Sequence, residues 1–263
     1  RLKWSRAFWG KQPKGSVRRK TLLVTGASAG TGAATAQAAA AESYDTAIIN
    51  YRSDRASADT VAQMVNAQGC EAVVIRADIT DPAAVAAMFE QITALPPAAL
   101  NLVNNAGIVA PRVSINDLTP DRISAVFFLN VAAAIEVARH AVAYMRAHHG
   151  GGMVNVSSST AHKGMAHEYI DYAASKAAIE TFTLGLADEL APEGIRVNAV
   201  RPGLIETGIH AKGGVPDRIA QFAHTTPMGR AGTAQEVAKA ILWLLSNEAS
   251  YTTRSILDVA GGR

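Results

Sequence analysis

The sequence predicts an α/β fold in which a doubly wound parallel sheet lies between two layers of helices. Three observations support this fold class. Short apolar segments rich in β-branched residues alternate with longer segments of helical character. The first apolar segment runs straight into a cluster of glycines, as a strand does before a tight turn into a helix. With 263 residues, the chain has room for a single domain of this kind.

The expected elements alternate from Thr21 to the end of the chain. Asp81 and Pro82 begin the third helix, because aspartate caps a helix and proline suits its first turn. Strands are expected at residues 21–25, 46–51, 72–77, 100–103, 153–156, 197–200 and 255–259. Helices are expected at residues 33–41, 57–68, 81–95, 119–148, 172–191 and 233–245. This order predicts a Rossmann-like sheet whose ligands bind at the carboxyl ends of the strands.

The glycine cluster after the first strand has the spacing Gly-x-x-x-Gly-x-Gly. Gly26 permits the turn, Gly30 lets the backbone approach a pyrophosphate, and Gly32 lets the helix pack closely on the sheet. A phosphate would then lie at the N-terminus of the helix. A purely structural turn would use the same glycines, so the cluster alone does not establish a nucleotide site.

A tyrosine and a lysine stand four residues apart near the start of a later helix. Residues at this spacing share one helix face, so Lys176 can place its ammonium beside the Tyr172 phenol. A phenol titrates near ~10, and lowering its pKa to about 7 takes roughly 4 kcal/mol. One positive charge at ~4 Å supplies about that much at an effective dielectric constant of ~20. The spacing therefore predicts an acid–base tyrosine, although a packed tyrosine beside a solvated lysine would give the same pattern.

Together with Asn104-Asn105-Ala106-Gly107 and Arg201-Pro202-Gly203, these motifs resemble those of the short-chain dehydrogenase/reductase family. The resemblance extends from about residue 20 to residue 263 and is strongest to the branch of 3-oxoacyl-carrier-protein reductases and glucose 1-dehydrogenases. It implies hydride transfer between a nicotinamide and a carbonyl or secondary alcohol, with NADPH-dependent reduction of a ketone or 3-oxoacyl group as the expected reaction. A sugar dehydrogenase and a non-catalytic dinucleotide-binding regulator are the alternatives.

The resemblance also assigns catalytic roles. Ser158 binds the substrate oxygen, Tyr172 donates the proton, Lys176 holds the phenolate, and Asn130 anchors a water that relays protons. Ser157, Ser158 and Ser159 are adjacent, and the family pattern Asn-x-Ser-Ser favours the second serine. Tyr169 has no lysine four residues later, so it is expected to form a wall of the pocket.

The same resemblance predicts that NADP(H) is the preferred cofactor, with NAD(H) possible. Arg52 follows the second strand where an acidic residue would mark NAD use, although Ala29 stands where many NADP-using relatives carry a second base. The expected cofactor-binding residues are Gly26, Ser28, Gly30, Thr31, Gly32, Tyr51, Arg52, Asp78, Ile79, Asn105, Ala106, Gly107, Tyr172, Lys176, Pro202, Gly203, Ile205 and Thr207.

Charge divides the chain into two parts. Residues 1–20 hold 8 of the 25 basic residues and no acidic one, which leaves 17 basic against 22 acidic residues in 21–263, a net charge of −5. We expect an N-terminal extension outside the catalytic domain, and no nucleic-acid or membrane partner.

Cys70 is the single cysteine and no Cys/His spacing indicates a metal site, which favours a cytoplasmic enzyme. A dimer or tetramer is implied by the resemblance.

The segment 206–227 is expected to act as a lid over the substrate. It contains several glycines and a proline, together with His210, Lys212 and Asp217. This mixture of side chains indicates no substrate class. Arg112 and Arg139 could contribute to a docking surface for an acyl carrier, but two scattered bases are usually solvated.

Overall fold

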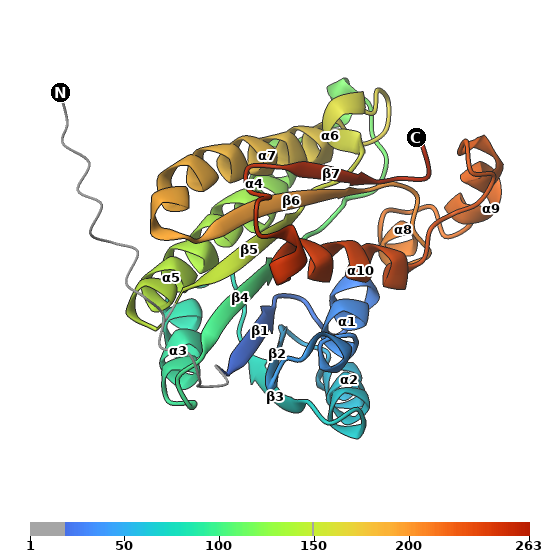
Figure 1. The fold of residues 1–263 in the computed structure, drawn as a ribbon. Coiled ribbons are helices and arrows are strands. Elements are labelled where there is room, and N and C mark those ends of the chain that lie inside the picture. Colours follow the sequence, from blue (N-terminus) through green and yellow to red (C-terminus); the bar gives the residue numbers. More distant parts are fainter. Residues whose placement is uncertain (1–18, 149) are drawn as a thin grey trace.

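The computed structural model describes residues 19–148 and 150–263, and within them one sheet of seven parallel strands forms the centre of the molecule (Figure 1). The strand order is β3-β2-β1-β4-β5-β6-β7. The strands are β1 (Lys20–Val24), β2 (Thr46–Tyr51), β3 (Glu71–Arg76), β4 (Ala99–Asn104), β5 (Gly151–Val156), β6 (Arg196–Pro202) and β7 (Ile256–Val259). The chain winds outward in both directions from β1 and β4, so the order reverses between these two strands.

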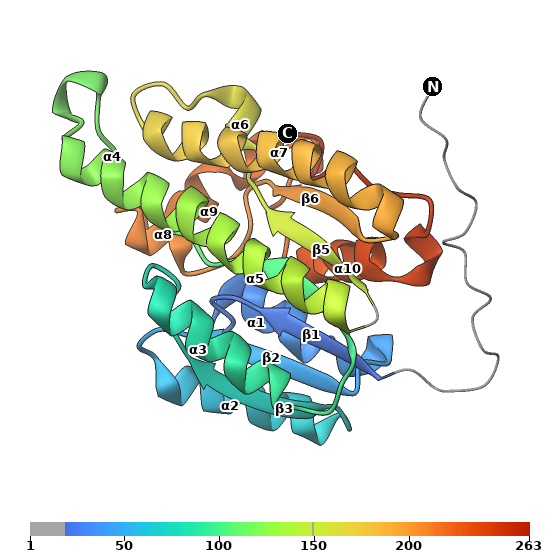
Figure 2. The same ribbon diagram turned by 90° about the vertical axis from the view of Figure 1, so that its left-hand side faces the viewer.

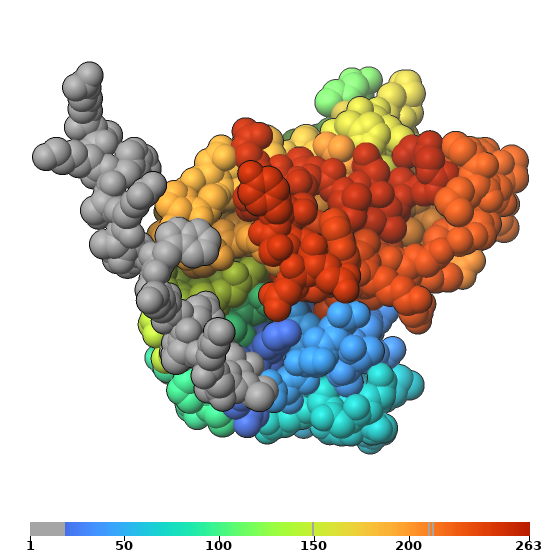
Figure 3. All heavy atoms as spheres, viewed as in Figure 1, coloured from blue at the N-terminus to red at the C-terminus, as the bar shows by residue number. Residues whose placement is uncertain are grey.

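Helices cover both faces of the sheet (Figures 1 and 2). One layer contains α1 (Gly30–Gln37), α2 (Arg55–Ala67) and α10 (Ala234–Leu245). The other contains α3 (Pro82–Thr93), α4 (Pro120–Phe127), α5 (Ala134–Ala147) and α7 (Ile170–Leu190). Shorter helices α6 (Thr160–Lys163), α8 (Ile209–Lys212) and α9 (Arg218–Phe222) lie in connections. In the space-filling view, the C-terminal part of the chain (orange to red) forms the upper part of one face, above the N-terminal strands and helices (blue to cyan) (Figure 3).

The two helical layers explain why the central strands are buried along most of their length. All six residues of β2 are buried, because a parallel strand that is covered on both faces has no solvent side. Successive side chains point to opposite faces. Leu22 of β1 accordingly packs in the cluster beneath α1, α2 and α10, whereas Leu23 packs in the cluster beneath α3, α5 and α7.

Helix starts follow the local chemistry of the sequence. Asp81 caps α3, accepting a hydrogen bond from the Ala83 amide at 2.9 Å, and Pro82 occupies the first turn as predicted. Thr233 and Glu236 form a reciprocal capping box at the start of α10. These caps satisfy amide groups that would otherwise lack partners.

The helix expected at residues 119–148 contains an irregularity that the sequence did not indicate. A π-helical segment, Phe128–Ala133, separates α4 from α5. The helix from Pro120 to Ala147 is 28 residues long and is apolar enough to span a membrane by length and composition. Its packing against β4, α3 and α7 gives another reason for this composition, because a helix buried against a sheet is also apolar.

The first strand begins one residue earlier than expected. Lys20 pairs with Ala99 across the sheet, and the Ala99 amide donates to the Arg19 carbonyl at 3.0 Å. Arg19 and Lys20, which were expected in the N-terminal extension, therefore belong to the folded domain. The rest of that extension, residues 1–18, lies outside the described residues.

Candidate functional site

A pocket of about 510 Å³ opens at the carboxyl ends of the strands. Residues after β1, β2, β3, β4, β5 and β6 line it, and the connections that contain α6, α8 and α9 close its other side. It lies where the strand order reverses between β1 and β4, which is the place where open α/β sheets bind ligands.

The glycine turn forms one wall of this pocket. Gly26 and Gly30 have φ of +62° and +56°, a backbone conformation that favours glycine. A Cβ on Gly32 would lie 2.5 Å from the side-chain nitrogen of Asn105 and 2.7 Å from the Gly26 carbonyl oxygen. Gly32 does not line the pocket; it allows the close packing of α1 that the sequence predicted.

The loop after β4 is fastened to the glycine turn. Asn105 donates from its side-chain nitrogen to the Thr25 and Gly26 carbonyl oxygens at 2.9 and 3.2 Å. The Thr25 hydroxyl accepts from the amides of Asn105 and Ala106 at 3.0 and 3.1 Å. These bonds hold the two walls of the pocket in a fixed relation.

The donor set at the start of α1 suits a pyrophosphate. Ala29 precedes the helix in an extended conformation, and no side chain caps the helix there. The amides of the first turn therefore point toward the pocket without a side-chain acceptor, and the helix dipole favours a negative charge at this end. The open space above Gly30, where a Cβ would have only Thr207 within 4 Å, leaves room for the phosphates.

Charged side chains line the end of the pocket beside β2 and β3. Arg52 is exposed there, and Asp78 accepts hydrogen bonds from the Thr80 amide and hydroxyl at 3.0 and 2.7 Å. Burial would raise the pKa of Asp78, but the Thr80 hydrogen bonds and the charge of Arg52 hold it below its usual value. Asp54, which the sequence analysis did not consider, also lines this end while capping α2 through the Ser57 amide at 3.0 Å.

Ser158, Tyr172 and Lys176 come together in the pocket. Ser158 follows β5, and its side chain lies beside that of Tyr172 near the start of α7, where it acts to lower the pKa of the phenol. The Lys176 ammonium lies 5.7 Å from the centre of the Tyr172 ring and donates to the Val156 carbonyl at 2.8 Å. Ser157 points elsewhere, since its hydroxyl donates to Glu180 at 2.7 Å. Strand alternation thus separates the two serines, as the choice of Ser158 required.

The expected lowering of the tyrosine pKa is not found. Burial raises the pKa of Tyr172 to about 12, outweighing the hydrogen bond with Ser158 that lowers it. Burial also lowers the pKa of Lys176 to about 8. The sequence argument counted the attraction between the two charged groups but omitted the cost of removing each from water, which dominates here.

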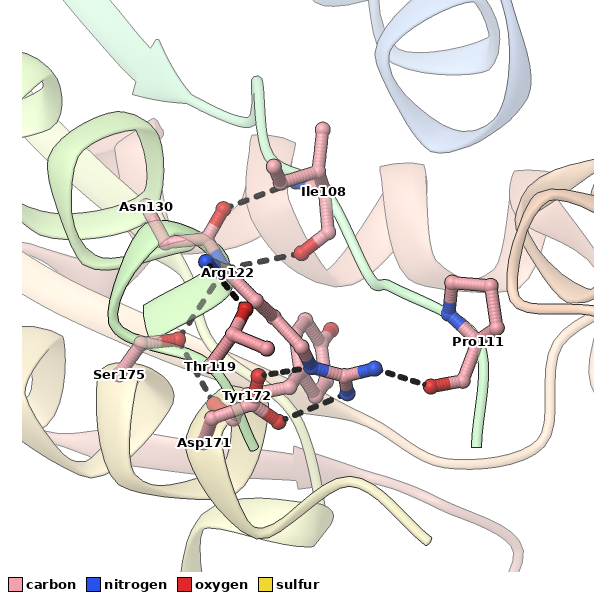
Figure 4. Close-up of polar contacts among 8 residues, drawn as sticks. All are labelled: Ile108, Pro111, Thr119, Arg122, Asn130, Asp171, Tyr172 and Ser175. Atoms are coloured by element: carbon pink, nitrogen blue, oxygen red, sulfur yellow. Dashed lines mark hydrogen bonds and ion pairs between the residues drawn. The ribbon is translucent and has the colours of Figure 1, made fainter. Parts of the chain in front are cut away.

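Asn130 lies in the π-helical segment and is 2% exposed. Its side-chain oxygen accepts from the Ile108 amide at 2.8 Å, and its nitrogen donates to the Ile108 carbonyl at 2.9 Å and to the Ser175 hydroxyl at 3.0 Å (Figure 4). Ser175 in turn donates to the Tyr172 carbonyl at 2.7 Å. Asn130 therefore joins the loop after β4 to the helix that carries the tyrosine, behind the pocket wall.

A buried ion pair supports the same helix. Arg122 of α4 donates to both carboxylate oxygens of Asp171, at 2.7 and 3.1 Å, and also to the Pro111 carbonyl (Figure 4). The two side chains are 13% and 2% exposed. Burial would raise the pKa of Asp171, but the hydrogen bonds from Arg122 hold it below its usual value. Because Asp171 directly precedes Tyr172, the pair fixes the start of α7.

Most of the residues expected to bind cofactor or substrate line this one pocket. The exceptions are Gly32, Tyr51 and Asn130, which lie behind its walls, and Tyr51 is buried. Tyr169 lines the pocket as expected. The pocket-lining residues that the sequence did not indicate include Leu129, Lys163, Arg218 and Arg263. Arg218 lies in the segment 206–227 that was expected to cover the substrate, but none of these four residues belongs to a motif that assigns it to the site.

Comparisons of the sequence with known proteins agree with these features. A family model described as "Enoyl-(Acyl carrier protein) reductase" matches residues 26–263. The chain is 46% identical over 244 residues to "Uncharacterized oxidoreductase YgfF" of Escherichia coli (strain K12), covering 92% of this chain and 98% of the relative. It is 36% identical over 244 residues to cis-4-hydroxycyclohexanecarboxylate dehydrogenase of Sinomonas cyclohexanicum, covering 92% and 96%.

Solved structures give the same result. A short chain dehydrogenase from Burkholderia cenocepacia J2315 in complex with NADP has a TM-score of 0.83 at 32% identity, covering 94% of this chain and 99% of that one. A short-chain type dehydrogenase/reductase from Mycobacterium marinum has a TM-score of 0.85 at 32% identity, covering 92% and 94%. The chain therefore belongs to the short-chain dehydrogenase/reductase family, and it is an oxidoreductase that acts on CH–OH groups with a nicotinamide dinucleotide.

Proposed function

We propose that this enzyme interconverts a ketone and a secondary alcohol, with NADPH-dependent reduction as the main direction. The observation that carries the proposal is the convergence of Ser158, Tyr172 and Lys176 on one pocket, with the Lys176 ammonium 5.7 Å from the centre of the Tyr172 ring. Two adjacent hydroxyl groups match a single carbonyl oxygen, because each can donate a hydrogen bond to it.

In this proposal the protein supplies orientation and a proton, and the bound nicotinamide supplies the hydride. Ser158 and Tyr172 hold the substrate oxygen. With its pKa raised to about 12, Tyr172 remains protonated at neutral pH and donates its proton as that oxygen gains negative charge. With its pKa lowered to about 8, Lys176 still carries a proton in most molecules at pH 7, and its charge stabilises the phenolate that forms.

Asn130 and Lys176 both lie close to Gly107, and this arrangement supports a positioning role for the asparagine. A Cβ on Gly107 would lie 3.1 Å from the Asn130 oxygen and 3.4 Å from the Lys176 nitrogen, so both side chains approach the same stretch of backbone. A water held between these groups and the Ile108 carbonyl would return a proton to the lysine. Glycine at position 107 keeps this space open.

The nature of the substrate follows in part from the relatives. The Sinomonas relative is by name a dehydrogenase of a ring alcohol, which agrees with a ketone or secondary alcohol here. A carrier-protein thioester has less support. Arg112 pairs with Glu168 and Arg139 with Glu136, so these two bases do not argue for a docking surface.

A homo-oligomer, a dimer or tetramer, forms part of the proposal. Ile123, Phe128 and Ile135 are 39%, 48% and 37% exposed along the helix from α4 to α5. Several large apolar side chains exposed on one run of helix are typical of an interface between subunits. Light scattering of the purified protein measures this state directly.

A substrate screen that follows NADPH absorbance tests the proposed reaction. Ketones, 3-oxoacyl thioesters, sugars and quinones are compared at equal concentration, and we expect turnover to be fastest with ketones. Calorimetry with NADP⁺ accompanies the screen. Binding of NADP⁺ without turnover of any of these compounds would favour the alternative of a dinucleotide-binding regulator.

We predict that Arg52→Ala lowers or reverses the preference for NADPH over NADH, mainly through KM. Arg52 lines the pocket beside β2, where a 2′-phosphate would lie. A charge-assisted hydrogen bond is worth ~1.5 to 3 kcal/mol, or roughly 10- to 150-fold in affinity, and we expect the lower end because Ala29 adds no second base. The measurement is kcat/KM with both cofactors.

Arg55→Ala is the matched control for this prediction. Arg55 is a nearby exposed arginine that pairs with Asp59 at 2.8 Å and does not line the pocket. Its substitution should leave the cofactor ratio unchanged. An Arg52→Ala enzyme that keeps the parental ratio would show that another group selects the cofactor.

A further inference from the structure

The two ends of the pocket differ in charge. Asp54 and Asp78 line the end beside β2 and β3, together with Arg52. At the opposite end, near α6 and α9, the charged lining residues that the structure describes are Lys163, Arg218 and Arg263. The side chains at this end are therefore basic, and none of the described lining residues there has a carboxylate side chain.

Arg218 is the central group of this basic end. The residue is 8% exposed, and its Nη1 donates to Glu168 at 2.9 Å. Its guanidinium lies 5.3 Å from the centre of the Tyr169 ring and 5.1 Å from that of Phe222. Among the described side chains, Glu168 is its one hydrogen-bond acceptor, although a guanidinium has five N–H donors. A buried arginine held in this way is rigid and still has donors to offer.

Positive charge exceeds negative charge around this arginine. Arg112 also lies near Glu168, at 3.7 Å, and the guanidinium carbons of Arg112 and Arg263 are each 6.0 Å from the centre of the Phe222 ring. One carboxylate thus faces two arginines, with a third arginine close by. Burial and then Arg263 lower the pKa of Lys163, while Asp258 partly opposes them. Arg112, Arg218, Arg263 and Lys163 thus stand against the carboxylates of Glu168 and Asp258, and the excess of positive charge favours a further carboxylate.

We propose, on the basis of the proposed ketone/alcohol reaction, that the substrate carries a carboxylate that binds Arg218, with Lys163 and Arg263 nearby. A guanidinium matches a carboxylate because two parallel N–H groups meet its two oxygens. The pocket wall between Arg218 and the reacting end includes Tyr169, three residues before Tyr172. Met165 and Ile209 also line the pocket, which suits an apolar body between the carboxylate and the reacting carbon.

Binding without turnover gives the first test. Benzoate and the uncharged benzamide are titrated by calorimetry into the enzyme saturated with NADP⁺. We expect benzoate to bind roughly 10- to 150-fold more tightly, the worth of a charge-assisted hydrogen bond. Equal binding of the two compounds, or absence of benzoate binding, would overturn the proposal whether or not any ketone is turned over.

Variants locate the group responsible. Arg218→Met should remove the advantage of benzoate, and Arg218→Lys, which keeps the charge but loses the two-pronged geometry, should retain part of it. Arg112→Met is the matched control, because Arg112 contacts the same Glu168 and Phe222 but does not line the pocket. Thermal unfolding and NADP⁺ affinity establish that each variant is folded. Loss of the advantage in Arg112→Met but not in Arg218→Met would contradict the assignment.

Kinetics separate this inference from the proposed function. 4-Oxocyclohexanecarboxylate is compared with 4-oxocyclohexanecarboxamide, and the ratio of their kcat/KM values should exceed about 10 and fall toward 1 in Arg218→Met. Faster turnover of the amide would overturn the carboxylate site while the ketone reductase stands. Tight benzoate binding without turnover of any ketone would instead overturn the proposed reaction and leave the carboxylate site in place.

Discussion

Replacing Tyr172 by phenylalanine should reduce kcat by ~10² to 10⁴, the usual contribution of a general acid. The substitution removes the phenol hydroxyl and keeps the ring beside Lys176. Because the pKa of Tyr172 is raised to about 12, the group that is lost is a protonated donor at every pH at which the enzyme is assayed. We expect the dissociation constant for NADPH to change by a few-fold at most.

The matched control for this variant is Tyr169→Phe. Tyr169 lines the same pocket, but its hydroxyl donates to the Gly213 carbonyl at 3.2 Å rather than to Ser158. Steady-state kinetics and fluorescence titration with NADPH are measured for both variants. Retention of more than about a tenth of kcat in Tyr172→Phe, or an equal loss in Tyr169→Phe, would contradict the assignment of Tyr172 as the acid.

Replacing Arg122 by methionine should lower the free energy of unfolding by about 3 to 5 kcal/mol, because it leaves the buried carboxylate of Asp171 without its partner. The Asp171 side chain is 2% exposed, so water cannot replace the two hydrogen bonds that are lost. We also expect kcat to fall, since the start of the helix that carries Tyr172 is no longer held. Urea unfolding measured by circular dichroism gives the change.

Arg139→Met controls for the loss of an arginine in the same run of helices. Arg139 also makes two hydrogen bonds to a carboxylate, that of Glu136, but its side chain is 62% exposed. Its loss should cost less than about 1 kcal/mol. Adding Asp171→Asn to Arg122→Met should recover part of the stability, because an amide is less costly to bury than an unpaired charge. A loss in Arg122→Met no larger than that in Arg139→Met would show that the buried pair is not important.

The sequence was sufficient for the elements whose pattern is local. β2 was predicted residue for residue, because a strand that is buried on both faces is mostly apolar, and the start of α3 was predicted from its cap. The presence of Ser158 and Tyr172 in one pocket was predicted, because Ser158 follows the fifth strand and Tyr172 begins the next long helix at the same edge of the sheet.

The sequence was insufficient where the pKa or the position of a side chain depends on residues that are distant in the chain. The pKa of Tyr172 reflects burial, which spacing along a helix does not report. Arg218 and Arg263 reach the pocket from connections that have no periodic pattern, and Tyr51 is turned into the core although it neighbours Arg52. In each case the deciding partner is distant in the chain, so no local motif marks it.

The π-helical segment Phe128–Ala133 divides the long helix into two halves that pack against different elements. Before it, α4 contacts α7, where Arg122 meets Asp171; after it, α5 contacts β4 and α3. One residue turns an α-helix by about 100°, so the extra residue in the wide turn sets the angular phase of each half separately. A substitution in α4 therefore affects the contact with α7, and one in α5 affects the contacts with β4 and α3. The loss of a single residue from the wide turn would instead rotate all the side chains of α5 about the helix axis relative to those of α4.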